Sequence, residues 1–232
     1  MKNIVIIGAG KGIGLAIASA LHPENQVIAI TKTPSEDLTK QGISTILLEA
    51  GKQNLQAGND FPEAIHGLVY CPGSITLKPF HRLREEDFLN DFRQNVLGAV
   101  QCIQELLPRL KQGKASVVLF SSVAARVGMP FHASIACSKS GLEALAKSLA
   151  AEYASIPIRF NVIAPSLSDT SLAQNLLNTP EKQDSAAKRH PLQRIGTVQD
   201  SAALAQFLLS ENSSWITGQV IGLDGGLGNL KV

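Results

Sequence analysis

A short apolar run followed at once by a glycine-rich turn constrains the fold of this chain more than any other feature. The run extends from Asn3 to Ile7, as expected of a buried strand in a parallel sheet. The turn after it leads into a helical spacing of apolar residues, and glycines at such a junction let backbone N–H groups approach a pyrophosphate. Glycines alone are also compatible with a turn that binds nothing, but this placement favours a dinucleotide site. The residues expected to contact the dinucleotide here are Gly8, Lys11, Gly12, Ile13 and Gly14.

Strand-like and helical patterns alternate along the rest of the chain. Further strands are expected at Gln26–Ile30, Ser44–Leu48, Gly67–Tyr70, Ser116–Phe120, Arg159–Ala164 and, after a turn, within Trp215–Leu223. Helical patterns occupy Ser35–Gln41, Arg84–Gln112, about Phe131–Tyr153 and Thr197–Leu209, with Thr197 as an N-cap. Such alternation is typical of α/β proteins. The sequence therefore predicts one Rossmann-type domain over residues 1–232, with a doubly wound parallel sheet of about seven strands.

The composition excludes several classes of protein. The chain of 232 residues is 44% apolar and 17% charged, as in ordinary globular domains, and its net charge of +2 gives no argument for nucleic acid or a membrane surface. No apolar run approaches the roughly 18 residues that a membrane span needs. Cys71, Cys102 and Cys137 form no CxxC pair, so we expect no metal site. Because the first strand starts at Asn3 and leaves no room for a signal peptide, we expect a cytoplasmic protein.

The residues after the second and third strands bear on which dinucleotide would bind. An acidic residue after the second strand of such folds bonds the ribose 2′-OH, whereas a basic one accommodates a 2′-phosphate. Here the second strand is followed by Thr31 and Lys32, and Lys11 lies in the glycine turn. This pattern favours NADP(H) over NAD(H). Glu49, after the third strand, has two interpretations, since it could reach an adenine edge or be a solvated loop carboxylate.

The stretch from Ser121 to Gly141 should hold the reaction centre. Ser122 follows a strand, at the edge where a parallel sheet opens its crevice, and Lys139 faces that crevice from the first turns of an Ala-rich helix. Position 135, four residues before Lys139, shares its helix face but is an isoleucine. Asn95 lies in the middle of a helical pattern, where an asparagine usually faces solvent. A serine, a lysine and an apolar side chain make an unusual acid–base site.

These motifs together resemble the short-chain dehydrogenase/reductase family, and most nearly its 3-oxoacyl-acyl-carrier-protein reductase type. The matching segments are Gly8-xxx-Gly12-x-Gly14, Asn95-Val96-x-Gly98, Ser122, Pro165-Ser166-x-x-Asp169-Thr170, Pro191 to Gly196, and Ile216 to Gly226. The resemblance implies a nicotinamide cofactor and a small carbonyl or alcohol substrate. It implies that Ser122 fixes the carbonyl and that Asn95 holds a water linking Lys139 to solvent. The further cofactor contacts that it implies are Thr31, Cys71, Gly73, Pro165, Ser166, Ser168 and Thr170.

Three departures from the family pattern are found. The Asn-Asn-Ala-Gly turn is Tyr70-Cys71-Pro72-Gly73 here, which keeps the glycine and loses the amides, and Ser166 replaces a glycine. In the Tyr-x-x-x-Lys motif, Lys139 is retained but the spacing puts the tyrosine at Ile135. That tyrosine donates a proton to the carbonyl oxygen in the family, and an isoleucine has no donor. His132, three residues earlier, could substitute for it or could be a surface histidine.

Two functions therefore remain open from the sequence. One is an NADP(H)-dependent oxidoreductase of low or altered activity, with His132, Ser122 or water as its proton source. The other is a redox-inactive cofactor-binding module that acts as a partner subunit. Lys139 fits both, because it can bond the nicotinamide ribose without catalysis. The polar segment of residues 168–190 predicts a lid over the site. The small residues of the Ala-rich helix, together with the family's habit, predict a homotetramer.

Overall fold

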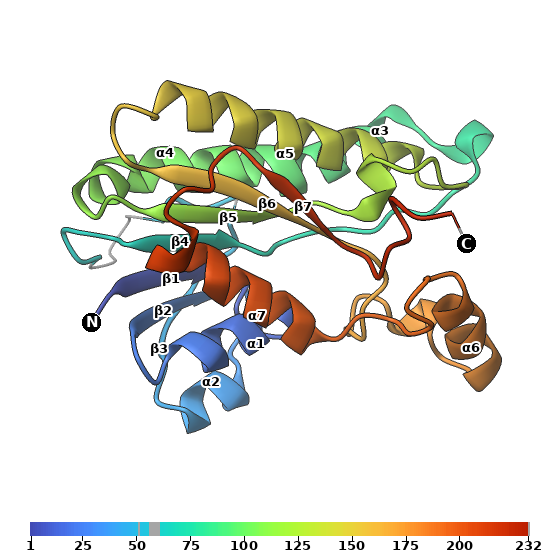
Figure 1. Ribbon diagram of the computed structural model, residues 1–232, viewed down its shortest axis with the longest axis horizontal. Coiled ribbons are helices and arrows are strands. Elements are labelled where there is room, and N and C mark those ends of the chain that lie inside the picture. The colour runs from blue at the N-terminus through green and yellow to red at the C-terminus, as the bar shows by residue number, and fades with distance from the viewer. Residues whose placement is uncertain (51, 56–60, 232) are drawn as a thin grey trace.

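The computed structural model describes residues 1–50, 52–55 and 61–231 and contains one seven-stranded sheet (Figure 1). The strands are β1 (Asn3–Ile7), β2 (Gln26–Thr31), β3 (Ser44–Leu47), β4 (Gly67–Tyr70), β5 (Ser116–Phe120), β6 (Arg159–Pro165) and β7 (Val220–Leu223). They lie in the order β3-β2-β1-β4-β5-β6-β7, and every neighbouring pair is parallel. The prediction of a single doubly wound Rossmann-type domain is confirmed.

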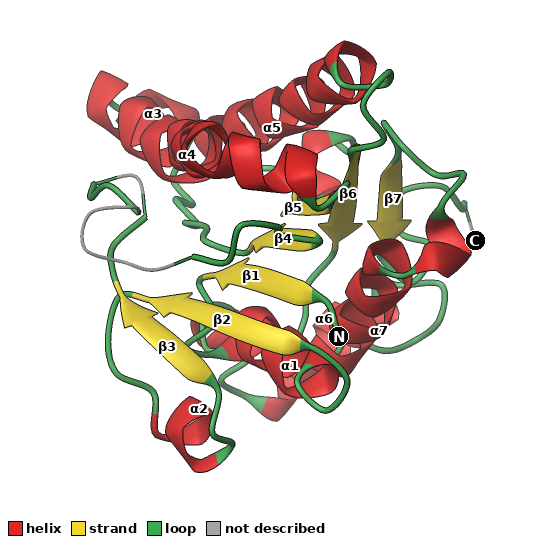
Figure 2. Cartoon of the chain, turned by 90° about the vertical axis from the view of Figure 1, so that its left-hand side faces the viewer, coloured by secondary structure: helices red, strands yellow, loops and turns green. Residues whose placement is uncertain are grey.

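Helices cover both faces of the sheet, as the two ribbon views show (Figures 1 and 2). They are α1 (Gly12–Leu21), α2 (Glu36–Lys40), α3 (Glu85–Phe92), α4 (Gly98–Gln112), α5 (Ala133–Glu152), α6 (Pro180–Lys188) and α7 (Val198–Leu209). The pair α4 and α5 packs on one face, and α1 and α7 pack on the other. Helix α6 stands beyond the carboxyl ends of the strands. No helix within the described residues is long and apolar enough to cross a membrane.

Successive strand residues supply the two cores in turn, because side chains alternate between the faces of a sheet. One core, under α4 and α5, contains Ile7, Tyr70, Leu119, Leu106 and Leu142. The other, under α1 and α7, contains Ile6, Val69, Val118, Ile17 and Leu208. All of these side chains are buried. Each contributes on the order of 1.5–3 kcal/mol relative to an exposed position, so both faces must be covered for the sheet to be stable.

The element expected over Arg84–Gln112 is not one regular helix, and this prediction is corrected. A π-helical turn at Arg93–Leu97 separates α3 from α4. The Gly98 N–H bonds to the Arg93 carbonyl, which leaves the Gln94 carbonyl free to accept a hydrogen bond of 2.6 Å from Tyr70 Oη. Asn95 is therefore buried rather than facing solvent. Turns of this kind are frequent at functional sites.

The other boundaries differ from the predictions by small amounts, and the seventh strand occupies the end of its predicted range, after a turn. Strand pairing there begins only at Val220, because Gly218 turns the chain with a φ of +70°. The predicted N-cap Thr197 is confirmed, since its hydroxyl accepts a hydrogen bond from the Asp200 N–H. The segment of residues 168–190 is not an open loop, because it contains a 3₁₀ turn at Gln174–Leu176 and helix α6.

The contact between Tyr70 and Gly98 generates a prediction about stability. A Cβ on Gly98 would lie 2.3 Å from Tyr70 Oη, so Gly98→Ala should lose about 1–3 kcal/mol of unfolding free energy through overpacking. Tyr70→Phe should lose a comparable amount, because the partly buried hydrogen bond from Tyr70 Oη to the Gln94 carbonyl is lost. The double variant should lose less than the sum, since phenylalanine lacks the colliding oxygen. Urea unfolding of the three variants measures this, and strictly additive losses would contradict the contact.

Candidate active site

Two adjoining cavities lie along the carboxyl ends of the strands, where parallel α/β sheets bind ligands. The apolar cavity, of about 540 Å³, lies beyond β5 and β6 and is bounded by the segment leading to α6. The glycine-turn cavity, of about 960 Å³, lies beyond β1 and β2. The two share the lining residues Ile13, Cys71, Gly73, Thr170 and Leu172. They therefore form one continuous crevice.

The glycine turn packs tightly against the start of α1. A Cβ on Gly14 would lie 2.3 Å from the Gly8 carbonyl oxygen, so only glycine permits this approach. Lys11 is the N-cap of α1, makes no side-chain capping hydrogen bond, and is followed by no acidic residue in the first turn. Gly8, Lys11, Gly12, Ile13 and Gly14 all line the glycine-turn cavity. The positive end of the helix thus faces the cavity without a protein anion, as an anion-binding site requires.

Lysines gather at the far end of the same cavity. Lys32 Nζ lies 3.0 Å from a Glu49 carboxylate oxygen, and Lys52 Nζ lies 3.0 Å from the same oxygen. Hydrogen bonds from Lys32 and Lys52 lower the pKa of Glu49. Thr31 is buried and donates to the Thr33 carbonyl at 2.8 Å. Glu49 therefore holds two lysines at the cavity wall in this structure, a setting that the sequence did not suggest.

The turn after β4 leaves a small gap between two polar groups. Asn95 Nδ2 donates to the Asp91 carbonyl at 2.8 Å and to Ser74 Oγ at 3.1 Å, whereas the buried Oδ1 atom has no hydrogen-bond partner. A Cβ on Gly73 would lie 3.4 Å from both Asn95 Oδ1 and Lys139 Nζ. Buried acceptors are almost always satisfied by protein or ordered water. The gap at Gly73 is therefore suited to a water or a ligand hydroxyl.

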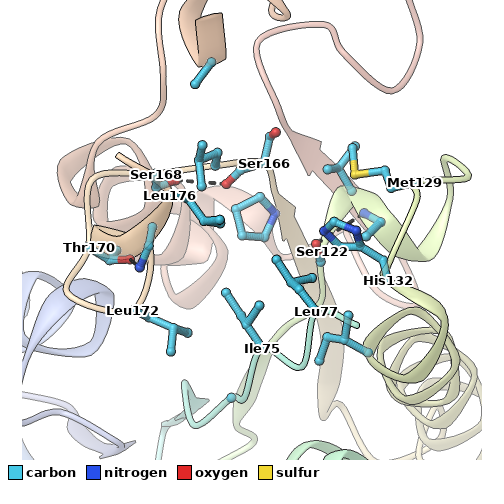
Figure 3. Close-up of a pocket in the computed structure, with 18 of the residues that line it drawn as sticks. Ile75, Leu77, Ser122, Met129, His132, Ser166, Ser168, Thr170, Leu172 and Leu176 are labelled. Carbon is cyan, nitrogen blue, oxygen red and sulfur yellow. Dashed lines mark hydrogen bonds between the residues drawn. The ribbon is translucent and has the colours of Figure 1, made fainter. Parts of the chain in front are cut away.

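Ser122, His132 and Ile135 line the apolar cavity. Ser122 Oγ accepts a 3.2 Å hydrogen bond from the Ala124 N–H. In Figure 3, Ser122 and His132 lie on one side of the cavity, with Leu172 among the residues of the opposite side. His132 Nδ1 lies 2.7 Å from the Pro130 carbonyl oxygen, so Nδ1 is the donor and, in the neutral ring, Nε2 carries the lone pair. Ile135 is only 4% exposed, and its apolar side chain contributes no hydrogen-bonding atom to the cavity wall.

Lys139 is a buried cation in the same cavity. It is 6% exposed, and its Nζ donates a 2.7 Å hydrogen bond to the Phe120 carbonyl. Burial lowers the pKa of Lys139 to about 8, and the nearby Cys71 and Asp91 oppose this shift only in part. No carboxylate of the described residues forms an ion pair with Lys139. At pH 7 roughly one molecule in ten therefore carries Lys139 as a neutral amine.

The wall opposite Ser122 carries several hydroxyl groups. Ser168 Oγ donates to the Ser166 carbonyl at 3.1 Å, and Thr170 lines both cavities (Figure 3). Ser166, which follows Pro165 at the end of β6, places its Oγ 2.8 Å from Nε2 of the buried His190. The other ring nitrogen of His190 contacts the Ala186 carbonyl at 2.8 Å. The sequence analysis missed His190, because no local spacing connects it to Ser166.

Asp91 is a second residue that the sequence analysis missed. It is 1% exposed, and its carboxylate accepts hydrogen bonds from Ser74 Oγ (2.5 Å), Thr76 Oγ1 (3.1 Å) and Ser134 Oγ (2.6 Å). These bonds tie the turn after β4 to both α3 and α5. The only signal in the sequence was its position four residues before Asn95, which puts both residues on one face of the helix.

Comparison with known proteins agrees with the geometry. A family model described as enoyl-(acyl carrier protein) reductase matches residues 8–228. The 3-oxoacyl-[acyl-carrier-protein] reductase FabG of Thermotoga maritima is 31% identical, over 97% of both chains. A short-chain type dehydrogenase/reductase from Mycobacterium ulcerans superimposes with a TM-score of 0.86 at 26% identity, over 98% of this chain and 90% of that one. The chain belongs to the short-chain dehydrogenase/reductase family.

A second solved structure, that of ElxO, is also similar to this chain. A tyrosine-to-phenylalanine variant of ElxO has been solved with NADPH bound, and it superimposes with a TM-score of 0.85 at 26% identity, over 97% of this chain and 98% of that one. The resemblance drawn from the motifs is confirmed, and the chain is related to oxidoreductases over nearly its whole length. Within the part of the chain that the structure describes, no three His, Cys, Asp or Glu side chains gather in a possible metal site.

The buried Lys139 generates a prediction about the pH dependence of stability. Its pKa is about 8 in the native state and about 10.4 in an unfolded chain, so the unfolded state binds more protons between these values. Stability from this group therefore rises with pH across that window, by up to about 3 kcal/mol. Lys139→Met should abolish that part of the rise, while Lys147→Met, an exposed change on the same helix, should keep it. Urea unfolding across the window measures this; parallel curves for wild type and Lys139→Met would contradict the shifted pKa.

Proposed function

We propose that this chain is an oxidoreductase that transfers a hydride between NADP(H) and the carbonyl or alcohol group of a small molecule with an apolar body. The observation that carries the proposal is the continuous crevice, which joins a glycine-turn cavity to an apolar cavity beside Ser122 and Lys139. Three apolar side chains of the apolar cavity remain partly exposed, namely Ile75 (40%), Leu172 (54%) and Leu176 (37%). An apolar substrate would remove this surface from water.

The residues of the crevice fit a nicotinamide dinucleotide. The open N-terminus of α1 suits a pyrophosphate, and the unpartnered Asn95 Oδ1 facing the gap at Gly73 suits a hydroxyl or bridging water. The residues proposed to hold the phosphate and adenosine portion are Gly8, Lys11, Gly12, Ile13, Gly14, Thr31, Lys32 and Glu49. Those proposed for the nicotinamide portion are Cys71, Gly73, Asn95, Lys139, Pro165, Ser166, Ser168 and Thr170. When bound, the cofactor supplies or accepts the hydride.

The chain's own residues would orient the substrate and manage the proton. Ser122 would hold the carbonyl oxygen through its hydroxyl, and His132 would supply the proton from Nε2 in its imidazolium form. Lys139 would hold the ribose, and Asn95 would bind a water between Lys139 and solvent. Ile135 would exclude water from the carbonyl carbon. Because the phenol of the family motif is missing, we expect a low or altered activity.

A redox-inactive, cofactor-binding subunit is the second candidate. It is favoured by the burial of Ile135, whose apolar side chain occupies the motif position where the family has its tyrosine. The NADPH-bound tyrosine-to-phenylalanine variant of ElxO supports the idea that a relative can bind NADPH with one tyrosine fewer. The retained Lys139 and the intact glycine turn are needed for binding in either case. Turnover of a carbonyl substrate separates the two functions.

We also propose that residues 168–190 act as a lid and that the protein is a cytoplasmic homotetramer. Leu172, Leu176 and Arg189 of this segment line the apolar cavity, so movement of the segment would change access to it.

For the assembly, Ala144 and Ala151 are exposed on α5, and Leu97 is 48% exposed beside α4. Small and apolar groups on neighbouring helices would let two subunits pack closely. Light scattering at micromolar concentration tests this, and a monomer would contradict it.

The lysines around Glu49 generate a prediction about cofactor choice. Calorimetric titration should show tighter binding of NADPH than of NADH. Lys32→Asp should reverse the preference, because a carboxylate repels the 2′-phosphate and bonds a free 2′-OH. Glu49→Gln should increase it by up to about tenfold, since Lys32 and Lys52 are released from the carboxylate. Equal affinities of the wild type for both cofactors would contradict the proposed preference for NADPH.

Ile135 and His132 generate the prediction that tests the redox function. The assay is NADPH oxidation with a panel of apolar ketones and 3-oxoacyl thioesters. Ile135→Tyr should raise the rate towards the ~10²–10⁴-fold range of general-acid catalysis, unless the larger ring overpacks its neighbours at a cost of ~1–3 kcal/mol. His132→Ala in the native background should lower the rate if His132 supplies the proton.

The outcomes of this experiment are distinct. Efficient turnover by the wild type that Ile135→Tyr slows would show that the site is built around the isoleucine, and the account of a missing acid would be wrong. Cofactor binding without turnover in both wild type and Ile135→Tyr protein would favour the redox-inactive subunit. A melting curve for each variant confirms that the change in rate is not a loss of folding.

A further inference from the structure

We propose that Lys139 is a nucleophile, whose amine condenses with an aldehyde or ketone in the apolar cavity to form an imine. This is a covalent activity separate from hydride transfer, and it does not depend on the redox function proposed above. The site consists of one buried amine, the hydroxyl of Ser122 and the imidazole of His132 at the same cavity. The ligand class is a carbonyl compound with an apolar chain or ring.

The state of the Lys139 side chain is the first argument. Nζ has one hydrogen bond, 2.7 Å to the Phe120 carbonyl, and the described residues place no carboxylate in ion-pair contact with it. Its burial holds its pKa near 8, so at pH 7.5 roughly one molecule in four carries the neutral amine. For a lysine with the ordinary pKa of about 10.4 the fraction is about one in a thousand. A desolvated amine of this kind is the form that attacks carbonyl carbons.

The surroundings of Nζ are the second argument. Ile135, one turn before Lys139 on the same cavity wall, offers no hydroxyl that could bond the amine or fill the space with a ring. The missing side chain of Gly73 leaves room beside Nζ, since a Cβ there would lie 3.4 Å from it. The cavity lining also includes the apolar side chains of Ile75, Leu77, Met129, Leu172 and Leu176. A carbonyl compound in the cavity is therefore brought to the amine in an environment that disfavours charge.

The reaction balances with groups that the cavity holds. The amine lone pair forms a C–N bond to the carbonyl carbon, and the carbonyl oxygen takes a proton to give a carbinolamine. The nitrogen gives up two protons in all, one as the carbinolamine forms and one as the C=N bond forms. The oxygen receives both, its C–O bond breaks, and it leaves as water. Ser122 and the free Nε2 of His132 can transfer these protons. No oxidant or reductant is needed, and water reverses the step.

Reductive trapping tests the proposal on the intact protein. Hexanal and sodium cyanoborohydride are added without nucleotide at about pH 7.5, and labelled residues are identified by peptide mass mapping. Lys139 should be labelled on the order of a hundredfold faster than an exposed lysine such as Lys147, in line with the difference in neutral amine. The labelling rate should rise with pH and level off above about pH 8. Lys147→Met should leave labelling at Lys139 unchanged, and Lys139→Met should abolish the fast phase.

Further measurements keep the result independent of folding and of the redox function. The decisive rates come from wild-type protein, so misfolding of Lys139→Met cannot produce them. NADPH should protect Lys139 if the nucleotide occupies the neighbouring gap. Labelling at Lys139 without NADPH oxidation would support the imine site and contradict the redox function. NADPH oxidation with an unlabelled Lys139, or equal labelling of Lys139 and Lys147, would overturn the imine proposal.

Discussion

The parallel pairing of β1 with both β2 and β4 is the constraint on which the rest of the structure depends. From the carboxyl end of β1 the chain turns towards β2, and from the carboxyl end of the neighbouring β4 it turns the other way, towards β5, so these two connections diverge between β1 and β4. A crevice at this point is a consequence of strand order rather than of any side chain. Because every strand is parallel, the turns after β1, β4, β5 and β6 all begin at the same, carboxyl-end edge of the sheet. Residues as distant in sequence as Gly14, Gly73, Ser122 and Ser166 are thereby brought around one crevice.

The buried Lys139 is the costly feature of this crevice. An ammonium group without a carboxylate partner is unfavourable in an apolar cavity, and the lowered pKa of Lys139 expresses that cost. A methionine of similar length would pack there without it. Strongly perturbed lysines gather at functional sites, since chemistry requires a group poised between its charged and neutral forms. The structure around Lys139 agrees with such a role. The Asp91 carboxylate accepts hydrogen bonds from three hydroxyl groups and makes no ion pair with Lys139.

The sequence predicted the parts of the fold and site that depend on local chemistry. The apolar runs located the seven strands, the glycine spacing located the turn before α1, and Thr197 was recognised as a cap from its position alone. It could not predict features made by contacts between distant segments. The π-helical turn at Asn95 requires the hydroxyl of Tyr70, which lies 24 residues before Gln94. The same is true of the pair Ser166 and His190, and of the lysines that surround Glu49.

The isoleucine at position 135 connects the two chemistries considered for this crevice. In the family motif, a phenol beside the lysine serves as the acid, and the ammonium assists it. Without the phenol, the cavity loses a proton donor, and the lysine loses a neighbour that could share its charge through a hydrogen bond. The first loss slows carbonyl reduction, whereas the second favours the neutral amine and thus attack on a carbonyl carbon. Both effects follow from one side chain. A site can therefore exchange acid catalysis for nucleophilic chemistry while its glycine turn, Ser122 and Lys139 stay in place.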